Sequence, residues 1–253
     1  MTSQPSVREQ SEIARSASEA SKIVLEPAEI DRYLDPPPDS PFPLEYAFYL
    51  LGDIRGKTVL DLGCGSGESL CVLVHRGARA IGIDISPELI ELARRRLREG
   101  RVDADVRVGS AYDTELPDGS VDVVFCMSLI HHLDIPRVRD EMRRVLRPGG
   151  FVVLKEPIRF SKAYDRLRSW LPAQEDISEY EHPLTREEFR TVQEEFTVEA
   201  TRYLRLPFVP LVQRTLPGAG RSANRLSHWL LTKFPAAERY ATVATLRLRK
   251  PER

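Results

Sequence analysis

From Thr58 onward, short runs of apolar residues alternate with segments in which apolar residues recur at helical spacing. Runs of five to seven residues bounded by glycine or proline are typical of buried strands. Strands that are regularly separated by helices predict parallel crossovers and a doubly wound α/β sheet. The expected strands are 58–62, 78–83, 102–108, 121–125 and 151–155, and the expected helices are 66–75, a helix opened by Pro87, and 136–146.

The two ends of the chain do not share this rhythm. Residues 1 to about 25 are polar with a short amphipathic helix, 35–41 is proline-rich and extended, and 44–51 reads as an apolar helix. Past Glu156 we expect a helix capped by 185–188, a strand over 196–206, and an irregular basic stretch over 207–235 in which 221–234 is helix-like. A last strand is expected over 240–248, at or near a sheet edge. We therefore divide the chain into an N-terminal segment and linker (1–43) and one domain (44–253), with a core (44–157) and a substrate-lid part with the last strands (158–253).

The average charge of the protein hides an asymmetry. The 253 residues carry 37 basic and 38 acidic side chains and 42% apolar residues, typical of a globular protein and no reason to expect nucleic acid. Residues 201–253 nevertheless hold 11 basic and 2 acidic residues, a balance of 11 − 2 = +9. We expect this basic part to pack on the body as a lid, ahead of a subunit interface giving a homo-oligomer or a peripheral membrane contact.

The cysteines and the N-terminus indicate a reducing, cytoplasmic location. Cys64, Cys71 and Cys126 have no CxxC spacing, so neither a disulfide framework nor a zinc site is expected, and we predict no metal. The first 22 residues lack the apolar core of a signal peptide, and no apolar stretch is long enough to span a membrane.

The strongest local motif is VLDLGCGSG at 59–67, a strand that runs into a glycine turn and a helix. Glycines at this junction let bare backbone approach a ligand. A dinucleotide fingerprint would need a third glycine where the chain has Glu68, which disfavours an NAD-dependent oxidoreductase. Asp84 ends the second strand, where a carboxylate reaches ribose hydroxyls. Together these features indicate an adenosine-containing ligand other than NAD.

Four sequence blocks in this order resemble the class I S-adenosylmethionine-dependent methyltransferases, of the type found in ubiquinone and menaquinone biosynthesis. The blocks are VLDLGCGSG (59–67), GIDIS (82–86), GSAYDTELPDGSVDVVFCMSLIHHL (109–133) and RRVLRPGGFVVLKEP (143–157). The resemblance implies a Rossmann-like, mostly parallel seven-stranded sheet with helices on both faces and a last antiparallel strand. It also implies that the cofactor is S-adenosyl-L-methionine.

The resemblance also assigns expected roles to individual residues. Many relatives carry an acidic residue where this chain has Ser110, whose hydroxyl can accept the same bond from the adenine amino group. In this assignment Asp61, Gly63, Gly65 and Gly67 line the methionine and ribose part, Asp84 binds the ribose hydroxyls, Ile85 contacts the adenine face, Ser110 and Ala111 lie at the adenine edge, and Cys126 and Met127 mark the meeting point of cofactor and substrate.

Two histidines follow the fourth expected strand at the carboxyl edge of the sheet. A histidine there suits general base catalysis, because imidazole titrates near neutral pH. Of His131 and His132 we favour His132 as the base, with the alternative that one of them only braces the loop. Glu156 either points into the site or simply ends its strand.

Several other residues have both a structural and a functional interpretation. We expect the N-terminal segment, with Tyr46 and Phe48, and the segment 159–183 to close over the acceptor. Tyr180, Glu181 and His182 either line that site or form a solvated loop. The small cysteines are expected to be packing residues, and Arg94, Arg95 and Arg96 a solvated helix face.

The sequence thus predicts methyl transfer from S-adenosylmethionine to a small organic molecule by in-line displacement, in which positioning of the acceptor does most of the work. Two alternatives stay open. In one, the cofactor site serves a non-methylating reaction such as a cyclisation. In the other, the protein is a catalytically inactive binding protein.

Overall fold

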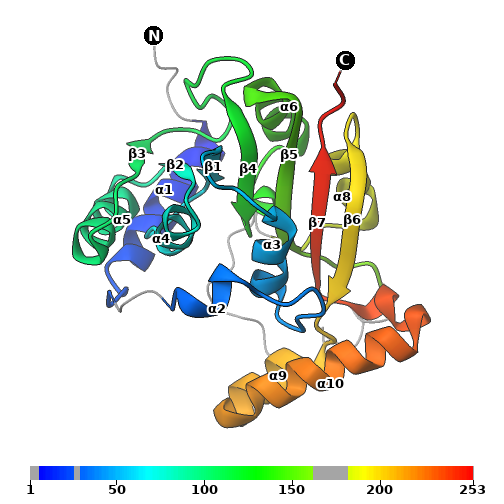
Figure 1. Cartoon of the computed structure of the whole chain (residues 1–253). Coiled ribbons are helices and arrows are strands. Elements are labelled where there is room, and N and C mark those ends of the chain that lie inside the picture. The colour runs from blue at the N-terminus through cyan, green and yellow to red at the C-terminus, as the bar shows by residue number, and fades with distance from the viewer. Residues whose placement is uncertain (1–5, 26–28, 162–181, 253) are drawn as a thin grey trace.

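The short apolar runs form one seven-stranded sheet in the computed structural model, which describes residues 6–25, 29–161 and 182–252 (Figure 1). The strand order is β3-β2-β1-β4-β5-β7-β6, with β1 to β5 mutually parallel and β7 antiparallel to both of its neighbours. The expected fold class is therefore confirmed. The strands are β1 (Thr58–Leu62), β2 (Arg79–Asp84), β3 (Asp105–Val108), β4 (Val121–Met127), β5 (Leu146–Pro157), β6 (Thr197–Leu204) and β7 (Val243–Arg249).

Helices precede the sheet, connect its strands and follow β6. Pro87 and Pro136 lie in the first turns of α5 and α6, where the missing N–H costs nothing. Thr185 and Glu188 form the expected capping box before α8. The α-helices are α1 (Val7–Ala20), α2 (Asp31–Leu34), α3 (Pro43–Leu51), α4 (Glu68–His75), α5 (Pro87–Gly100), α6 (Ile135–Val145), α8 (Arg186–Gln193), α9 (Phe208–Thr215) and α10 (Gly220–Lys233), with 3₁₀ turns at Ile130–His132, Pro217–Ala219 and Pro235–Tyr240.

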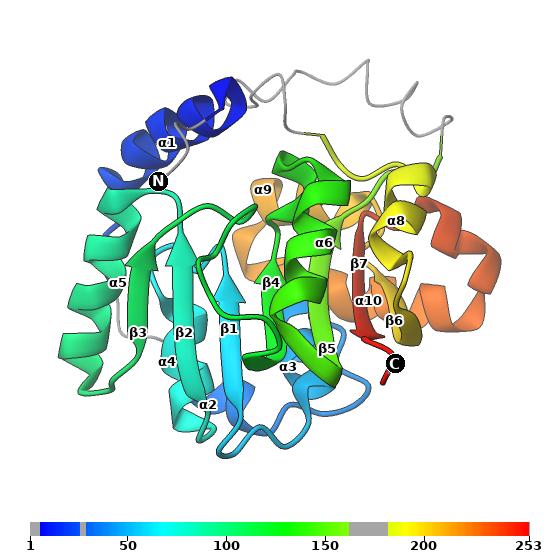
Figure 2. The same cartoon turned by 90° about the horizontal axis from the view of Figure 1, so that it is seen from above.

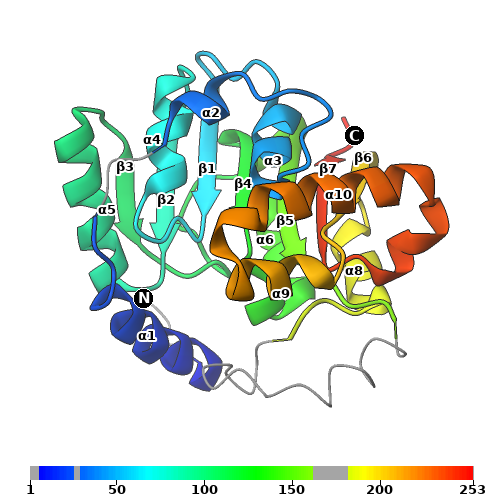
Figure 3. The same ribbon diagram turned by 90° about the horizontal axis from the view of Figure 1, so that it is seen from below.

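The sheet separates two apolar layers. On one face α3, α4 and α5 supply Phe48, Leu70 and Ile90 to a cluster with the sheet, and on the other face α6 and α8 supply Met142 and Phe189. Figure 2 shows α6 and α8 in front of the sheet, and Figure 3 shows α3, α9 and α10 on the opposite side. Both faces are thus covered, as a mostly parallel sheet requires.

The functional edge of the sheet lies where the parallel strands end. The strand order reverses between β1 and β4, and ligands of open α/β sheets bind in the crevice beyond the carboxyl ends at such a point. Helix α1 crosses this edge beside β2 and β3 and contacts α5 (Figure 2). Among the described residues, none of the helices is both long and apolar enough to cross a bilayer.

Several expectations from the sequence need correction. The stretch 207–220, expected to be irregular, holds α9, whereas α10 coincides with the expected helix-like segment 221–234, and β7 lies next to the edge strand β6, near the sheet edge as expected. Arg96 is 5% exposed, because its Nε donates to the Ser66 carbonyl while its neighbours face solvent. Phe48 does not close over a site but packs on Phe125 in the core.

Candidate functional site

The turn after β1 exposes main chain in a conformation that favours glycine. Gly63, Gly65 and Gly67 all have positive φ, at +75°, +51° and +81°. A Cβ on Gly63 would come within 2.9 Å of the Leu129 side chain, whereas the space beside Gly65 is open. The turn therefore presents bare backbone at the carboxyl edge of the sheet.

Asp84 is held against this turn by backbone donors. The Gly65 N–H donates to Asp84 Oδ2 (2.9 Å), and the Ser86 N–H donates to Oδ1 (3.0 Å). Burial raises the pKa of Asp84, while the N–H donors act in the opposite direction. The carboxylate thus has a fixed position, with lone pairs left for hydroxyl donors of a ligand.

Asp61, near the end of β1, is a buried acid without a partner. The residue is 2% exposed, and its Oδ2 has no hydrogen-bond partner in the described part of the chain. Burial, reinforced by the charge of Asp84, raises the pKa of Asp61 to about 8. A cationic group beside Asp61 would relieve this cost, because it would favour the ionised carboxylate.

Residues from three of the four sequence blocks, together with residues of α1, line one cavity of about 220 Å³ beside the glycine turn. Asp61, Gly67, Cys126 and His131 are not among its lining residues, and Met127 lines it in place of the fully buried Cys126. The expected site residues that do line it are Gly63, Gly65, Asp84, Ile85, Ser110, Ala111 and His132.

Helix α1, in the N-terminal segment that was expected to close over the acceptor, covers this cavity with polar side chains. Ser110 Oγ donates to Glu9 Oε1 (2.6 Å), and it accepts a bond from the Tyr112 N–H (3.1 Å). Burial opposes ionisation of Glu9, but the bonds from Ser110 and Ser6 hold its pKa below the usual value. A carboxylate therefore stands beside Ser110, supplied by α1. Its sequence signal was the capping box of Ser6 and Glu9.

A second polar contact joins α1 to His132. Glu12 Oε1 lies 3.5 Å from His132 Nδ1, and Arg15 Nη2 lies 3.4 Å from His132 Nε2. Although burial opposes it, contact with His132 and Arg15 lowers the pKa of Glu12. His132 thus lies between the carboxylate of Glu12 and the guanidinium of Arg15 on the cavity wall.

His131 is held from the opposite side by Glu156. His131 Nδ1 lies 2.8 Å from Glu156 Oε2, while Glu156 Oε1 accepts from the N–H groups of Leu129 (2.9 Å) and Ile130 (3.0 Å). Glu156 is 0% exposed, so its carboxylate is fully engaged with this loop. With Nδ1–H donating to the carboxylate, Nε2 is the basic nitrogen of His131.

His131 lines a second cavity, which shares Arg8 and Leu133 with the first. His182 and Leu184 form part of its far wall. Tyr180 and Glu181, which were candidates for the acceptor site, lie outside the described residues. In the ranges 6–25, 29–161 and 182–252, no group of three or more His, Cys, Asp or Glu could hold a metal ion.

Comparison with known sequences places these residues in a family. Residues 60–154 match the family model described as "Methyltransferase domain". The chain is 42% identical over 106 residues to an uncharacterised 37.1 kDa transposon protein of Streptomyces fradiae, covering 40% of this chain and 30% of that protein. It is 37% identical over 117 residues to the ubiquinone biosynthesis O-methyltransferase of Xanthomonas oryzae, covering 46% of this chain and 48% of that enzyme. The matches thus span less than half of these relatives.

A solved structure resembles the whole chain in fold. Geranyl diphosphate C-methyltransferase from Streptomyces coelicolor, in complex with Mg²⁺, geranyl diphosphate and S-adenosyl-L-homocysteine, superposes with a TM-score of 0.65. The two sequences are 19% identical, and the match covers 98% of this chain and 100% of that chain. At this identity the likeness shows the fold alone.

Proposed function

Residues 60–154 belong to the class I S-adenosylmethionine-dependent methyltransferases, and on this premise we propose that the protein transfers a methyl group from S-adenosylmethionine to a small organic acceptor. One observation carries the proposal. The glycine turn, Asp84, and the pair Ser110 and His132 come from three separate motif blocks and line a single cavity at the carboxyl edge of the sheet.

The polar groups of the cavity fit this cofactor. Asp84 would accept from the ribose hydroxyls, with Ile85 against the adenine. Ser110 already donates to Glu9 and accepts from Tyr112, so Glu9 is the stronger acceptor for the adenine amino group. Asp61, with its unpartnered oxygen and raised pKa, would stabilise the cationic methionine part.

When bound, S-adenosylmethionine supplies an activated methyl group, so the protein mainly has to position the acceptor. An acceptor that must lose a proton also needs a base. Glu156 fixes the orientation of His131, whereas Glu12 and Arg15 hold His132 on the cofactor side. We therefore assign the base to His131, and to His132 a role in shaping the cofactor cavity.

Binding and turnover test the two parts of this proposal separately. S-adenosylhomocysteine is expected to raise the melting temperature of the full chain, and Asp84→Ala to abolish the rise. Glu99→Gln, on the exposed face of α5, is the matched control and is expected to keep it. A wild-type protein that does not respond to either cofactor form contradicts the assignment of the cavity.

The second measurement is product formation. Incubation with labelled S-adenosylmethionine and a panel of hydroxyl, amine and carbon-acid acceptors is expected to yield S-adenosylhomocysteine together with a methylated product. Cofactor binding with an altered acceptor but no S-adenosylhomocysteine would favour the non-methylating alternative. Binding with no chemistry on any acceptor would favour the inactive binding protein.

A further inference from the structure

Two basic side chains lie in one row across β5, β7 and β6. Lys155 pairs with Thr245, and Thr245 pairs on its other side with Arg202. Directly paired residues point to the same face of a sheet, and each strand spacing is about 4.8 Å, so the two cationic residues start about 10 Å apart on one face. On the other side of Lys155 the partner is Met127, which lines the cofactor cavity. The row therefore begins at that cavity.

A third cation joins the row just beyond the end of β6. Arg205 has a left-handed backbone with φ +58°, and its carbonyl accepts from the Thr242 N–H (2.8 Å) and Oγ1 (3.0 Å), so its place is fixed by main chain. Burial lowers the pKa of Lys155; the adjacent Glu156 opposes this effect and Arg205 reinforces it. Lys155 and Arg205 are therefore close enough for their charges to repel.

These three side chains lack the partners that buried cations normally have. Arg202 Nη1 and Arg205 Nε are buried and have no hydrogen-bond partner. The Arg202 guanidinium lies over the ring of Tyr46, 3.7 Å from its centroid, and no carboxylate of residues 6–25, 29–161 or 182–252 forms an ion pair with any of the three. Glu156, next to Lys155, is committed to His131 and two backbone N–H groups. Buried donors without an acceptor destabilise the fold unless a ligand accepts hydrogen bonds from them.

The row also affects a histidine of α10. Burial and the charge of Arg202 lower the pKa of His228, an effect that the exposed Asp39 opposes, so the imidazole is neutral near pH 7. Thr245, which lies between Lys155 and Arg202 in the row, is fully buried. Helices α3, α9 and α10 cover this side of the molecule (Figure 3).

We propose that Lys155, Arg202 and Arg205 form a subsite for an anionic oxygen group of the methyl acceptor, a phosphate, diphosphate or carboxylate. Lys155, the member of the subsite nearest the cofactor, lies one strand spacing from Met127, so an acceptor anchored at the subsite reaches toward the cofactor cavity. Arginine and lysine from different elements converge on one anion as in other phosphate and carboxylate sites. This inference rests on the proposed function, because it names the acceptor class of that site.

The test uses the full chain saturated with S-adenosylhomocysteine, at constant ionic strength set with chloride. Inorganic pyrophosphate, inorganic phosphate and benzoate are titrated separately by calorimetry. We expect at least one of them to bind, and Arg202→Gln and Arg205→Gln each to weaken its binding about tenfold or more. Preference for pyrophosphate or phosphate over benzoate identifies a phosphorylated acceptor, and the reverse identifies a carboxylate.

The control is Arg225→Gln, which removes the same charge from the exposed face of α10 and is expected to leave the affinity within about twofold. Equal weakening by Arg225→Gln, or no binding of any probe by the cofactor-loaded wild type, overturns the subsite. Arg205→Lys keeps the charge and guards against a folding defect, since it must bind more tightly than Arg205→Gln. Failure of S-adenosylhomocysteine itself to bind contradicts the proposed function instead, so the two failures are distinguishable.

Discussion

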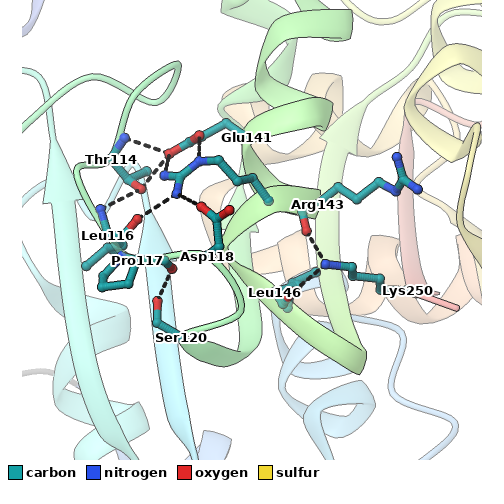
Figure 4. A network of polar contacts seen from close by, with 10 residues as sticks. Thr114, Leu116, Pro117, Asp118, Ser120, Glu141, Arg143, Leu146 and Lys250 are labelled. Carbon is teal, nitrogen blue, oxygen red and sulfur yellow. Dashed lines mark hydrogen bonds and ion pairs between the residues drawn. The ribbon is translucent and has the colours of Figure 1, made fainter. Parts of the chain in front are cut away.

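Two charged clusters of this protein differ in how completely the chain satisfies them. In the first, Glu141 accepts from the Thr114 N–H (2.7 Å), from Thr114 Oγ1 (2.6 Å) and from Arg144, and Arg144 also reaches Asp118 and the Leu116 carbonyl (Figure 4). In the second, Lys155, Arg202 and Arg205 have no such partners within the described ranges. In a cluster that only connects loops, the charged groups find their hydrogen-bond partners within the protein. In a cluster that binds a ligand, some of these groups have no partner until the ligand supplies one.

A separate set of satisfied bonds anchors the end of the sheet. Lys250, just after β7, donates from Nζ to the carbonyls of Arg143 (2.7 Å) and Leu146 (2.6 Å) at the end of α6 (Figure 4). Charge-assisted bonds to terminal helix carbonyls are stabilising in the same sense as a cation near a helix dipole. Both contacts join parts of the chain that are more than a hundred residues apart.

The largest expected effect comes from breaking the complete cluster. Glu141→Leu leaves the Thr114 donors and Arg144 without their acceptor and is expected to lower the free energy of unfolding by about 3 kcal/mol. Urea denaturation at pH 7 measures this change. Glu91→Gln, which removes an exposed partner of Arg98, should cost less than about 0.5 kcal/mol, and equal costs would show that the Glu141 network is not special.

The second-largest effect is expected at the Glu156–His131 pair, where the carboxylate is fully paired and fixes the orientation of the imidazole. Glu156→Gln keeps an oxygen for the backbone donors but turns an amide toward His131, which favours the wrong tautomer. With an acceptor that needs deprotonation, we expect kcat to fall about 100-fold while the affinity for S-adenosylhomocysteine stays near that of the wild type. An unchanged kcat and an unchanged pH profile would reduce Glu156 to a brace for the loop.

Asp61 offers a smaller effect, with a defined pH dependence. Its pKa of about 8 in the folded state exceeds the ordinary value of 3.8, so the folded protein binds the extra proton between these values and loses stability as pH rises through them. Asp61→Asn should therefore be more stable than the wild type by on the order of 1 kcal/mol at pH 8, and about equal to it at pH 4. Denaturation at both pH values checks this, and a gain that is the same at both would contradict the raised pKa.

The smallest effect is expected from the open cluster itself. Arg205→Met removes a mostly buried, unpaired guanidinium while keeping much of its volume, so it should raise the free energy of unfolding by up to about 1 kcal/mol without added anion. The corresponding change at a paired site, Arg144→Met, should be destabilising. If both substitutions lower the melting temperature alike, the contrast between the two clusters fails.

The central α/β part could be predicted from the sequence because its signals are local. The boundaries of β1 and the start of α5 follow from an apolar run and from a proline after Ser86, and the glycine turn follows from its own spacing. The convergence of Asp84 and Ser110 on one cavity follows from the order of parallel strands.

Other features depend on contacts between distant residues and could not be derived from local patterns. The bond between Ser110 and Glu9 joins residues 101 positions apart, so the amphipathic pattern of α1 could predict a helix but not its partner on the cavity wall. Arg96 is an arginine like its neighbours Arg94 and Arg95, yet its side chain is buried and donates to the Ser66 carbonyl. The row of Lys155 and Arg202 exists only through the register of β5, β7 and β6.

The cover formed by α1 has a kinetic consequence. Polar contacts from Glu9, Glu12 and Arg15 to Ser110 and His132 hold it on the cavity wall. Departure of a nucleoside-sized product past this helix requires these contacts to separate. Charged contacts weaken as salt shortens the Debye length, from about 10 Å at 0.1 M to about 3 Å at 1 M. The residence time of the spent cofactor should therefore shorten with ionic strength, and multiple-turnover rates should rise with salt wherever product departure limits them.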